Sequence, residues 1–277
     1  MVTEVNDCGE VLKPETAIPL ALVIAVLCFS GNSIVIFIYS RSKEIVESRI
    51  FELAFAVLDM SACALLLPTY FLSVPYAGIC RNEYVIEFIK ISRGIAGPVA
   101  FTAYYSLLVC VAIDRFCAVF YPLQFKIMRK GYIRKMLLTV VVFQLLVAVS
   151  TKLVSFFRIF SYLSLLYFLA AIVAIVVIVI LFTAIVVRIR RNSAQRAALG
   201  VGGQDAQHMK AVKIFSLITA FYLLGYVPFG LALVDILPAE FGFLYYINHV
   251  CNPIIYFAIN DQFRRDVIAV FKRCCRK

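Results

Sequence analysis

The chain has 277 residues, of which 63% are hydrophobic and 16% are charged, and its formal net charge is +11. A soluble domain is about half apolar and about a quarter charged, so this composition excludes an ordinary soluble protein. The apolar residues form long continuous blocks, which favours membrane-spanning helices over the short alternating strands of a membrane β-barrel. The predicted fold class is therefore an all-α membrane protein.

Seven apolar blocks follow one another along the chain, and each is close to the roughly 20 residues that cross a bilayer. The predicted fold is a single seven-transmembrane helix bundle over residues 1–277, with spans at about 17–40, 49–73, 89–120, 132–154, 159–189, 211–235 and 241–260. The block after the last span places Phe263, Val267, Val270 and Phe271 on one helical face. This pattern predicts a short amphipathic eighth helix at 261–272, lying in the membrane interface.

The distribution of basic residues predicts the orientation. If the N-terminus lies outside, twenty of the 27 lysines and arginines fall in cytoplasmic segments and six fall outside. Cytoplasmic loops carry such an excess of positive charge. The first ten residues are acidic and do not resemble a cleavable signal peptide. We therefore expect a multi-pass plasma-membrane protein with its N-terminus extracellular and its C-terminus cytoplasmic, and we read the net charge as attraction to lipid rather than nucleic acid.

Several residues outside the spans are candidates for covalent modification. Cys8 and Cys80 face the oxidising side, where they form either one disulfide or two free thiols. Cys274 and Cys275 follow the amphipathic helix and are candidates for palmitoylation. Ser193 follows two arginines and an asparagine in a cytoplasmic linker, which is the pattern that a basic-directed kinase reads.

Few polar side chains lie within the spans, and such residues are functional candidates by default. They are Asn32, Asp59, Asp114, Arg115, Asn248, His249 and Asn252. Asp59 stands alone in its span, at a depth that Asn32 and Asn252 can reach. Two interpretations stay open: the group holds a proton, a sodium ion or waters, or it is a structural polar contact joining three helices. For His249 we predict a hydrogen-bonded packing role, and we predict no metal site.

The polar residues fall in short motifs that resemble those of the rhodopsin-like (class A) G protein-coupled receptors. The motifs are G-N ending at Asn32, L-A-F-A-V-L-D ending at Asp59, A-I-D-R-F with Y-P at residues 121–122, F-Y-L-L-G-Y-V-P-F around Pro228, and N-P-I-I-Y over residues 252–256. The five motifs occur in the family's order, each on the corresponding span. The resemblance covers essentially the whole chain.

The resemblance implies roles for individual residues. Arg115 resembles the cytoplasmic switch arginine, which Asp114 holds at rest and which contacts the G protein on activation. The remaining residues implied in coupling and activation are Asn252, Pro253, Tyr256, Tyr226 and Pro228. Asn32, Asp59, Asn248 and Asn252 are similar to the family's sodium-and-water network. The implied partners are a heterotrimeric G protein, an unknown extracellular ligand and the lipid membrane.

The chain also departs from the family pattern. It has no tryptophan, so Tyr226 occupies the toggle position in the sixth span. Lys90 stands where the family has a disulfide cysteine at the start of the third span. Tyr104 replaces a small serine beside the sodium site, which argues against sodium as a cofactor. The chain therefore looks like a divergent orphan receptor.

Candidate ligand contacts lie in the outer half of the predicted bundle: Lys90, Arg93, Phe101, Phe229 and Tyr246. The basic residues at the outer mouth either recognise a carboxylate or phosphate, or extend to the interface without a ligand. The corresponding stretch of the third span has Gly97 and Pro98 in place of an amine-binding aspartate, and the seventh span has no lysine for retinal.

No catalytic motif occurs in the spans, so we do not expect an enzyme. The alternatives to a receptor are a small polytopic channel or transporter and a non-signalling seven-helix protein.

Overall fold

Almost all of the described residues are helical. The computed structural model describes residues 14–41, 43–72, 83–91, 95–157, 160–198, 204–233, 237 and 244–274. The helices are α1 (Pro14–Tyr39), α2 (Lys43–Leu72), α3 (Glu83–Ile91), α4 (Gly97–Phe120), α5 (Pro122–Phe157), α6 (Phe160–Ala198), α7 (Gln204–Leu233), α8 (Leu244–Ile259) and α9 (Asp261–Cys274).

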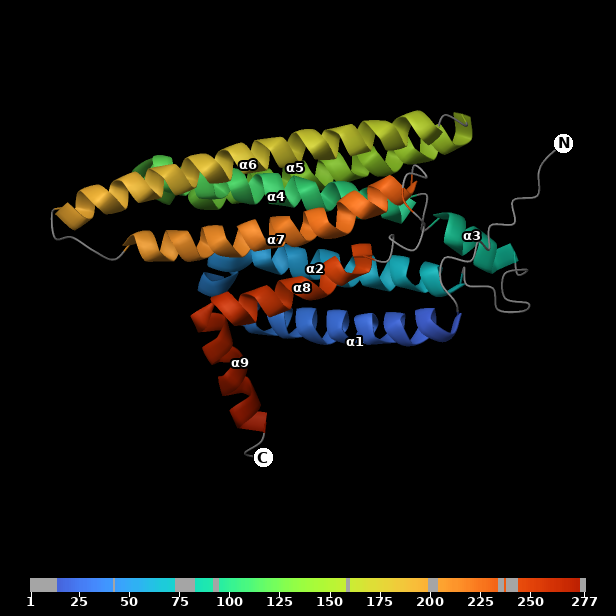
Figure 1. Cartoon of the computed structure of the whole chain (residues 1–277), viewed down its shortest axis with the longest axis horizontal. Helices are drawn as coiled ribbons and strands as arrows, with labels where there is room; N and C mark the ends of the chain where they lie inside the picture. Colours follow the sequence, from blue (N-terminus) through green and yellow to red (C-terminus); the bar gives the residue numbers. More distant parts are fainter. Residues whose placement is uncertain are drawn as a thin grey trace.

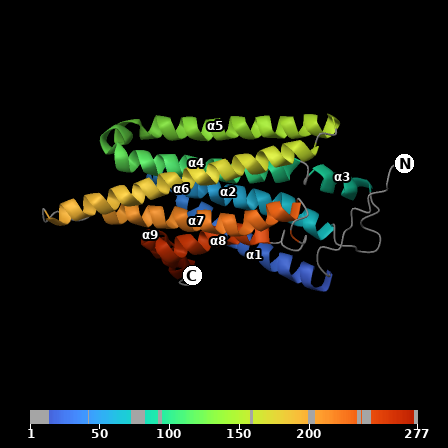
Figure 2. The same ribbon diagram turned by 45° about the horizontal axis from the view of Figure 1, so that its top comes forward.

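The long helices lie side by side along one axis, with α4 in contact with α2, α5, α6 and α7 (Figure 1). Helix α1 packs against α2 and α8, and α8 also packs against α7. Helix α9 turns away from this bundle at one end, which we call the α9 end, and α3 lies at the opposite end (Figure 2).

The surface of the bundle is apolar, as a lipid-facing surface must be. Leucine, isoleucine and valine side chains point outward along the helices, and Leu146, Val173 and Leu224 are each more than 60% exposed. Among the described residues, α1, α4, α5, α6 and α7 each contain a stretch that is long and apolar enough to cross a bilayer. The chain is therefore a multi-pass, all-α membrane protein.

Several predicted boundaries differ from the helices observed: α2 and α7 begin earlier than predicted, and α6 ends later. The predicted third span, 89–120, corresponds to α4 from Gly97 onward, while Glu83–Ile91 forms the separate helix α3. Pro98 lies in the first turn of α4, where a missing backbone N–H costs little. Helix α5 begins already at Pro122, ten residues before the predicted span, so the preceding segment is also helical.

Two glycines set the position of α8 between its neighbours. A Cβ atom on Gly31 of α1 would lie 3.0 Å from Cγ of Pro253, and one on Gly225 of α7 would lie 2.9 Å from the carbonyl oxygen of Leu244. Real Cβ atoms do not come that close to backbone oxygen. At these two glycines, helix α8 lies so close to α1 and α7 that not even a methyl group fits between them. This close packing brings the polar side chains of α8 into the centre of the bundle.

Helix α9 begins with a side-chain cap and is anchored to the bundle. The side-chain oxygen of Asn260 accepts a hydrogen bond from the backbone N–H of Phe263 at 3.2 Å, as an N-cap residue does. Phe263 is 2% exposed, and its ring centroid lies 5.4 Å from that of Tyr39. The helix predicted at 261–272 thus extends over Asp261–Cys274, with its first apolar residues packed on α1.

Candidate functional site

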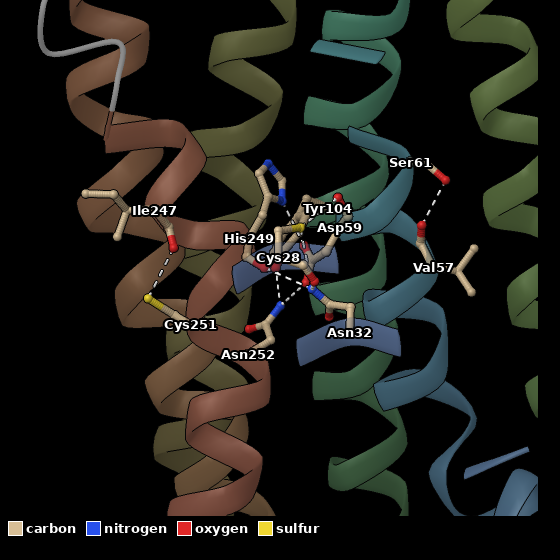
Figure 3. Close-up of polar contacts among 10 residues, drawn as sticks. All are labelled: Cys28, Asn32, Val57, Asp59, Ser61, Tyr104, Ile247, His249, Cys251 and Asn252. Carbon is tan, nitrogen blue, oxygen red and sulfur yellow. Dashed lines mark hydrogen bonds and ion pairs between the residues drawn. The ribbon is translucent and has the colours of Figure 1, made fainter. Parts of the chain in front are cut away.

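Five polar side chains from four helices meet at the centre of the bundle (Figure 3). They are Asn32 of α1, Asp59 of α2, Tyr104 of α4, and His249 and Asn252 of α8, and all five are 0% exposed. We call this group the Asp59 cluster. Because buried polar groups destabilise a fold unless they are hydrogen-bonded, their contacts decide what the cluster does.

Both carboxylate oxygens of Asp59 are occupied by nitrogen atoms of α8. Nδ1 of His249 lies 2.7 Å from Oδ1, and Nδ2 of Asn252 donates to Oδ2 at 2.7 Å. The same Asn252 nitrogen donates to the hydroxyl of Tyr104. Asp59 therefore joins α2 to α8, and Asn252 extends the connection to α4.

Asn32 connects α1 to the same place through backbone oxygens. Its Nδ2 donates to the carbonyl of His249 at 3.1 Å and to the carbonyl of Cys28, on its own helix, at 2.9 Å. The thiol of Cys28 in turn donates to the backbone carbonyl of Asp59 at 3.6 Å. Asn32, Asp59 and Asn252, which the sequence placed at one depth, thus converge in the structure.

Asn248 is not part of the cluster, whereas His249 is. Asn248 is 1% exposed, and neither its side-chain nitrogen nor its oxygen has a hydrogen-bond partner in the described part of the chain. Its Cβ lies beside Gly225, so this side chain faces α7. Adjacent helical residues point about 100° apart, which is why His249 meets Asp59 and Asn248 does not.

Asp59 can share a proton with His249, and oxygen atoms remain in the cluster for a cation. Hard cations take oxygen ligands, but here both oxygens of Asp59 already accept from, or share a proton with, nitrogen atoms. The ring of Tyr104 also fills space at this point, 5.2 Å from the ring of Phe55. Each carboxylate oxygen nevertheless has a second acceptor site, and the buried Oδ1 atoms of Asn32 and Asn252 have no hydrogen-bond partner among the described residues. A carboxyl and an imidazole at 2.7 Å can also exchange a proton.

An aromatic cluster lies next to the Asp59 cluster. Tyr104 stacks on Tyr222 with centroids 5.1 Å apart, and Tyr222 stacks on Tyr226 at 4.0 Å. Tyr226 contacts Tyr245 of α8 at 4.8 Å, and Tyr245 lies 4.7 Å from His249. The side chains of α4, α7 and α8 therefore form one continuous aromatic path to the polar core.

Three of the predicted ligand contacts belong to this aromatic cluster. Phe101 lies 5.0 Å from Tyr226, Phe229 lies 5.1 Å from Tyr245, and Tyr246 lies 5.1 Å from Tyr245, measured between ring centroids. Displacement of Phe101 or Phe229 acts directly on Tyr226, whereas displacement of Tyr246 reaches Tyr226 through Tyr245. Pro228 lies two residues further along α7, within the helix.

Asp114 and Arg115 form an ion pair near the α9 end of α4. Nε of Arg115 donates to Oδ2 of Asp114 at 2.9 Å, and Nη2 donates to the same oxygen. The side chains are 0% exposed for Asp114 and 18% for Arg115. The arginine is thus neutralised by its neighbour, and these two bonds use only part of its five N–H groups.

Tyr256 lies deeper at the same end. It is 0% exposed, its ring centroid is 6.3 Å from that of Phe263, and its hydroxyl has no hydrogen-bond partner among the described residues. Pro253, one turn earlier in α8, fills the space left by Gly31. A buried hydroxyl without a hydrogen-bond partner destabilises a fold. Any arrangement that supplies a partner for the Tyr256 hydroxyl is therefore stabilised.

Sequence reasoning missed a buried ion pair at this end of the bundle. Nη1 of Arg49 donates to Oε1 of Glu52 at 3.0 Å, and Glu52 is 3% exposed. Helix α2 bends at Arg49, whose φ and ψ are −121° and 21°. The signal was present in the spacing: Glu52 precedes Asp59 by seven residues, which is two helical turns on one face.

The remaining predicted sites are not described. Cys8, Cys80, Arg93 and Cys275 lie outside the described residues. Lys90 in α3, Ser193 in α6 and Cys274 in α9 lie in helices at positions whose side chains are not described. Among the described residues, no group of three metal-ligating side chains lies close enough to hold an ion.

No protein-family model matches the chain, and no curated protein is similar to it.

Proposed function

We propose that the chain is a rhodopsin-like G protein-coupled receptor with seven membrane spans, which passes an extracellular ligand signal to heterotrimeric G proteins at the plasma membrane. The five sequence motifs and their order support the proposal. The observation that carries it is the ion pair of Asp114 and Arg115 at the end of the central helix α4. An arginine held by its neighbour in a largely buried site is suited to release and rebinding.

The proposed mechanism begins in the aromatic cluster. A ligand that moves Phe101, Phe229 or Tyr246 shifts Tyr226 and the part of α7 around Pro228. The α9 end of α7 then pivots, and Arg115 leaves Asp114 to contact the G protein. The ligand acts only through tighter binding to this second arrangement.

G protein activation in cells, measured with and without a ligand panel, tests the proposal. We expect Arg115→Ala to abolish both basal and ligand-dependent signal at unchanged surface expression. The matched control is Lys135→Ala, which removes an exposed cation and leaves the ion pair intact. An Arg115→Ala variant that signals like the wild type, or a wild type at the surface that never signals, contradicts the proposal.

One observation favours a second candidate, a small proton-coupled transporter. Asp59 and His249 form a buried carboxyl–imidazole pair, and such pairs carry protons through membrane transporters. A gradient-dependent current in transfected cells that is lost in His249→Phe and unaffected in Arg115→Ala would favour the transporter over the receptor.

A further inference from the structure

Four charged side chains gather at the α9 end of the bundle, two from α2 and two from α4. Arg49 pairs with Glu52 at 3.0 Å, and Arg115 pairs with Asp114. The two acids are the most buried members, at 3% exposure for Glu52 and 0% for Asp114, while the side chains of Arg49 and Arg115 are 25% and 18% exposed. We call these residues the four-charge cluster. Its formal charge is zero, which lowers the cost of keeping two carboxylates away from water.

The two ion pairs of the cluster are not independent of each other. Arg115 lies within electrostatic range of Glu52, and their helices α4 and α2 are in contact. The hydroxyl of Tyr39 also lies beside the Glu52 carboxyl and is a competing donor. Each acid uses one oxygen for its own arginine and has a second, buried oxygen without a hydrogen-bond partner in the described part of the chain: Oε2 of Glu52 and Oδ1 of Asp114. Since buried acceptors are rarely left unfilled, the Glu52 oxygen is an acceptor for which Arg115 and the hydroxyl of Tyr39 compete.

Arg115 has enough N–H donors to bind the second oxygen of Glu52 as well. A guanidinium carries five N–H groups, and two of its nitrogens, Nε and Nη2, are spent on a single oxygen of Asp114. A cation that leaves Asp114 within an apolar interior needs another acid, because an unpaired buried charge is strongly destabilising. Glu52 lies on the neighbouring helix α2 and is held by its ion pair with Arg49, three residues earlier.

We infer that Glu52 is a second acceptor for the Arg115 guanidinium, which binds its free carboxylate oxygen when Arg115 leaves Asp114. Arg115 thereby moves between two acids on two helices without losing its counter-ion. The competing explanation is that Glu52 serves only Arg49, as a local pair within α2. The consequence for signalling rests on the proposed function, whereas the pairing itself does not.

A thermal-unfolding cycle on the purified full chain in detergent distinguishes the two explanations. The variants are Asp114→Asn, Glu52→Gln and the double variant, each made with Arg115 present and in an Arg115→Gln background. Each single change leaves Arg115 one acid, whereas the double change leaves it none. With Arg115 present, we therefore expect the double variant to lose about 3 °C or more in Tm beyond the sum of the single losses. In the Arg115→Gln background this excess disappears.

Additive losses in both backgrounds, or an excess that persists without Arg115, overturn the inference. The control pair is Asp114→Asn with Asp261→Asn, which removes the exposed acid that Arg264 contacts in α9, and its losses are expected to add. If the double variant does not fold, the inference requires Arg115→Gln to restore a monodisperse protein, and failure to restore it counts against the inference. No step uses a G protein, so a receptor that never signals refutes the proposed function while the cycle still decides the role of Glu52.

Discussion

Asp59 is the central polar residue of the described core. Its two oxygens hold two different side chains of α8, and its backbone carbonyl accepts from the thiol of Cys28. Removal of its carboxylate would leave His249 and Asn252 buried without that partner. The loss of stability is large because neither buried side chain can hydrogen-bond to water instead.

We therefore expect Asp59→Ala to destabilise the protein by about 3–5 kcal/mol, the usual cost of breaking a buried pair. For a chain of this size, that corresponds to a Tm lower by roughly 10 °C in detergent. Asp59→Asn keeps a side-chain oxygen and an amide at the same position, so its loss is expected to be smaller.

The control for Asp59 is Ser61→Ala on the same helix. Ser61 is exposed, and its one hydrogen bond among the described residues goes to the carbonyl of Val57 in its own helix, at 2.8 Å (Figure 3). Its replacement is expected to leave the Tm within about 1 °C, since surface changes cost little. If the Asp59→Ala variant has the same Tm as the Ser61→Ala variant, the Asp59 cluster contributes little to stability.

Single-residue patterns predicted which helices meet, but not which side chains touch. The common depth of Asn32, Asp59 and Asn252 was readable from the chain, and the structure brings these residues together. The choice between Asn248 and His249 depends on the rotation of α8, which is set by Gly225 and Pro253 packing on neighbouring helices. Tertiary contacts of this kind leave no periodic signal in one sequence.

At the scale of the helix, the close contact between α7 and α8 determines where the side chains of α8 lie. Helix α8 lies against α7 at Gly225, where a Cβ would stand 2.9 Å from the carbonyl oxygen of Leu244 and 3.4 Å from Cβ of Asn248. A backbone oxygen cannot rotate away as a side chain can. Any larger residue must therefore separate the two helices and displace the side chains of α8 from Asp59.

We expect Gly225→Ala to cost about 1–3 kcal/mol, the usual price of overpacking, seen as a lower Tm. Gly131→Ala is the matched control, since a Cβ there meets nothing within 4 Å. In helix α5 that change is expected to be neutral or to stabilise by up to about 1 kcal/mol. Equal Tm values for the two variants would contradict the close approach of α7 and α8.

The extent of the helices was partly readable from the sequence. The lengths of the apolar runs predicted the long helices, because a helix that crosses lipid needs a continuous run of apolar residues. The break between α3 and α4 and the early start of α5 at Pro122 were not predicted. Hydropathy marks where lipid contact ends, whereas a helix continues as long as its backbone hydrogen bonds do.

At the scale of the whole molecule, the number of spans decides which side of the membrane holds Arg115. Helix α8 has 16 described residues, which is about 24 Å at 1.5 Å per residue. That is shorter than the roughly 30 Å of hydrocarbon in a bilayer. An odd number of spans puts the two termini on opposite sides, and an even number puts them on the same side.

The charge distribution predicts opposite sides. Twenty basic residues fall in the segments that lie on the same side of the membrane as the C-terminus, and such an excess favours the cytoplasm. An epitope tag at the N-terminus is therefore expected to bind antibody on intact cells, and a C-terminal tag only after permeabilisation. A cytosolic marker that stays unlabelled in intact cells controls for leakage. If both tags label on the same side, one of the seven predicted spans does not cross. An externally oriented C-terminus would place Arg115 and the four-charge cluster away from any G protein and refute the proposed function.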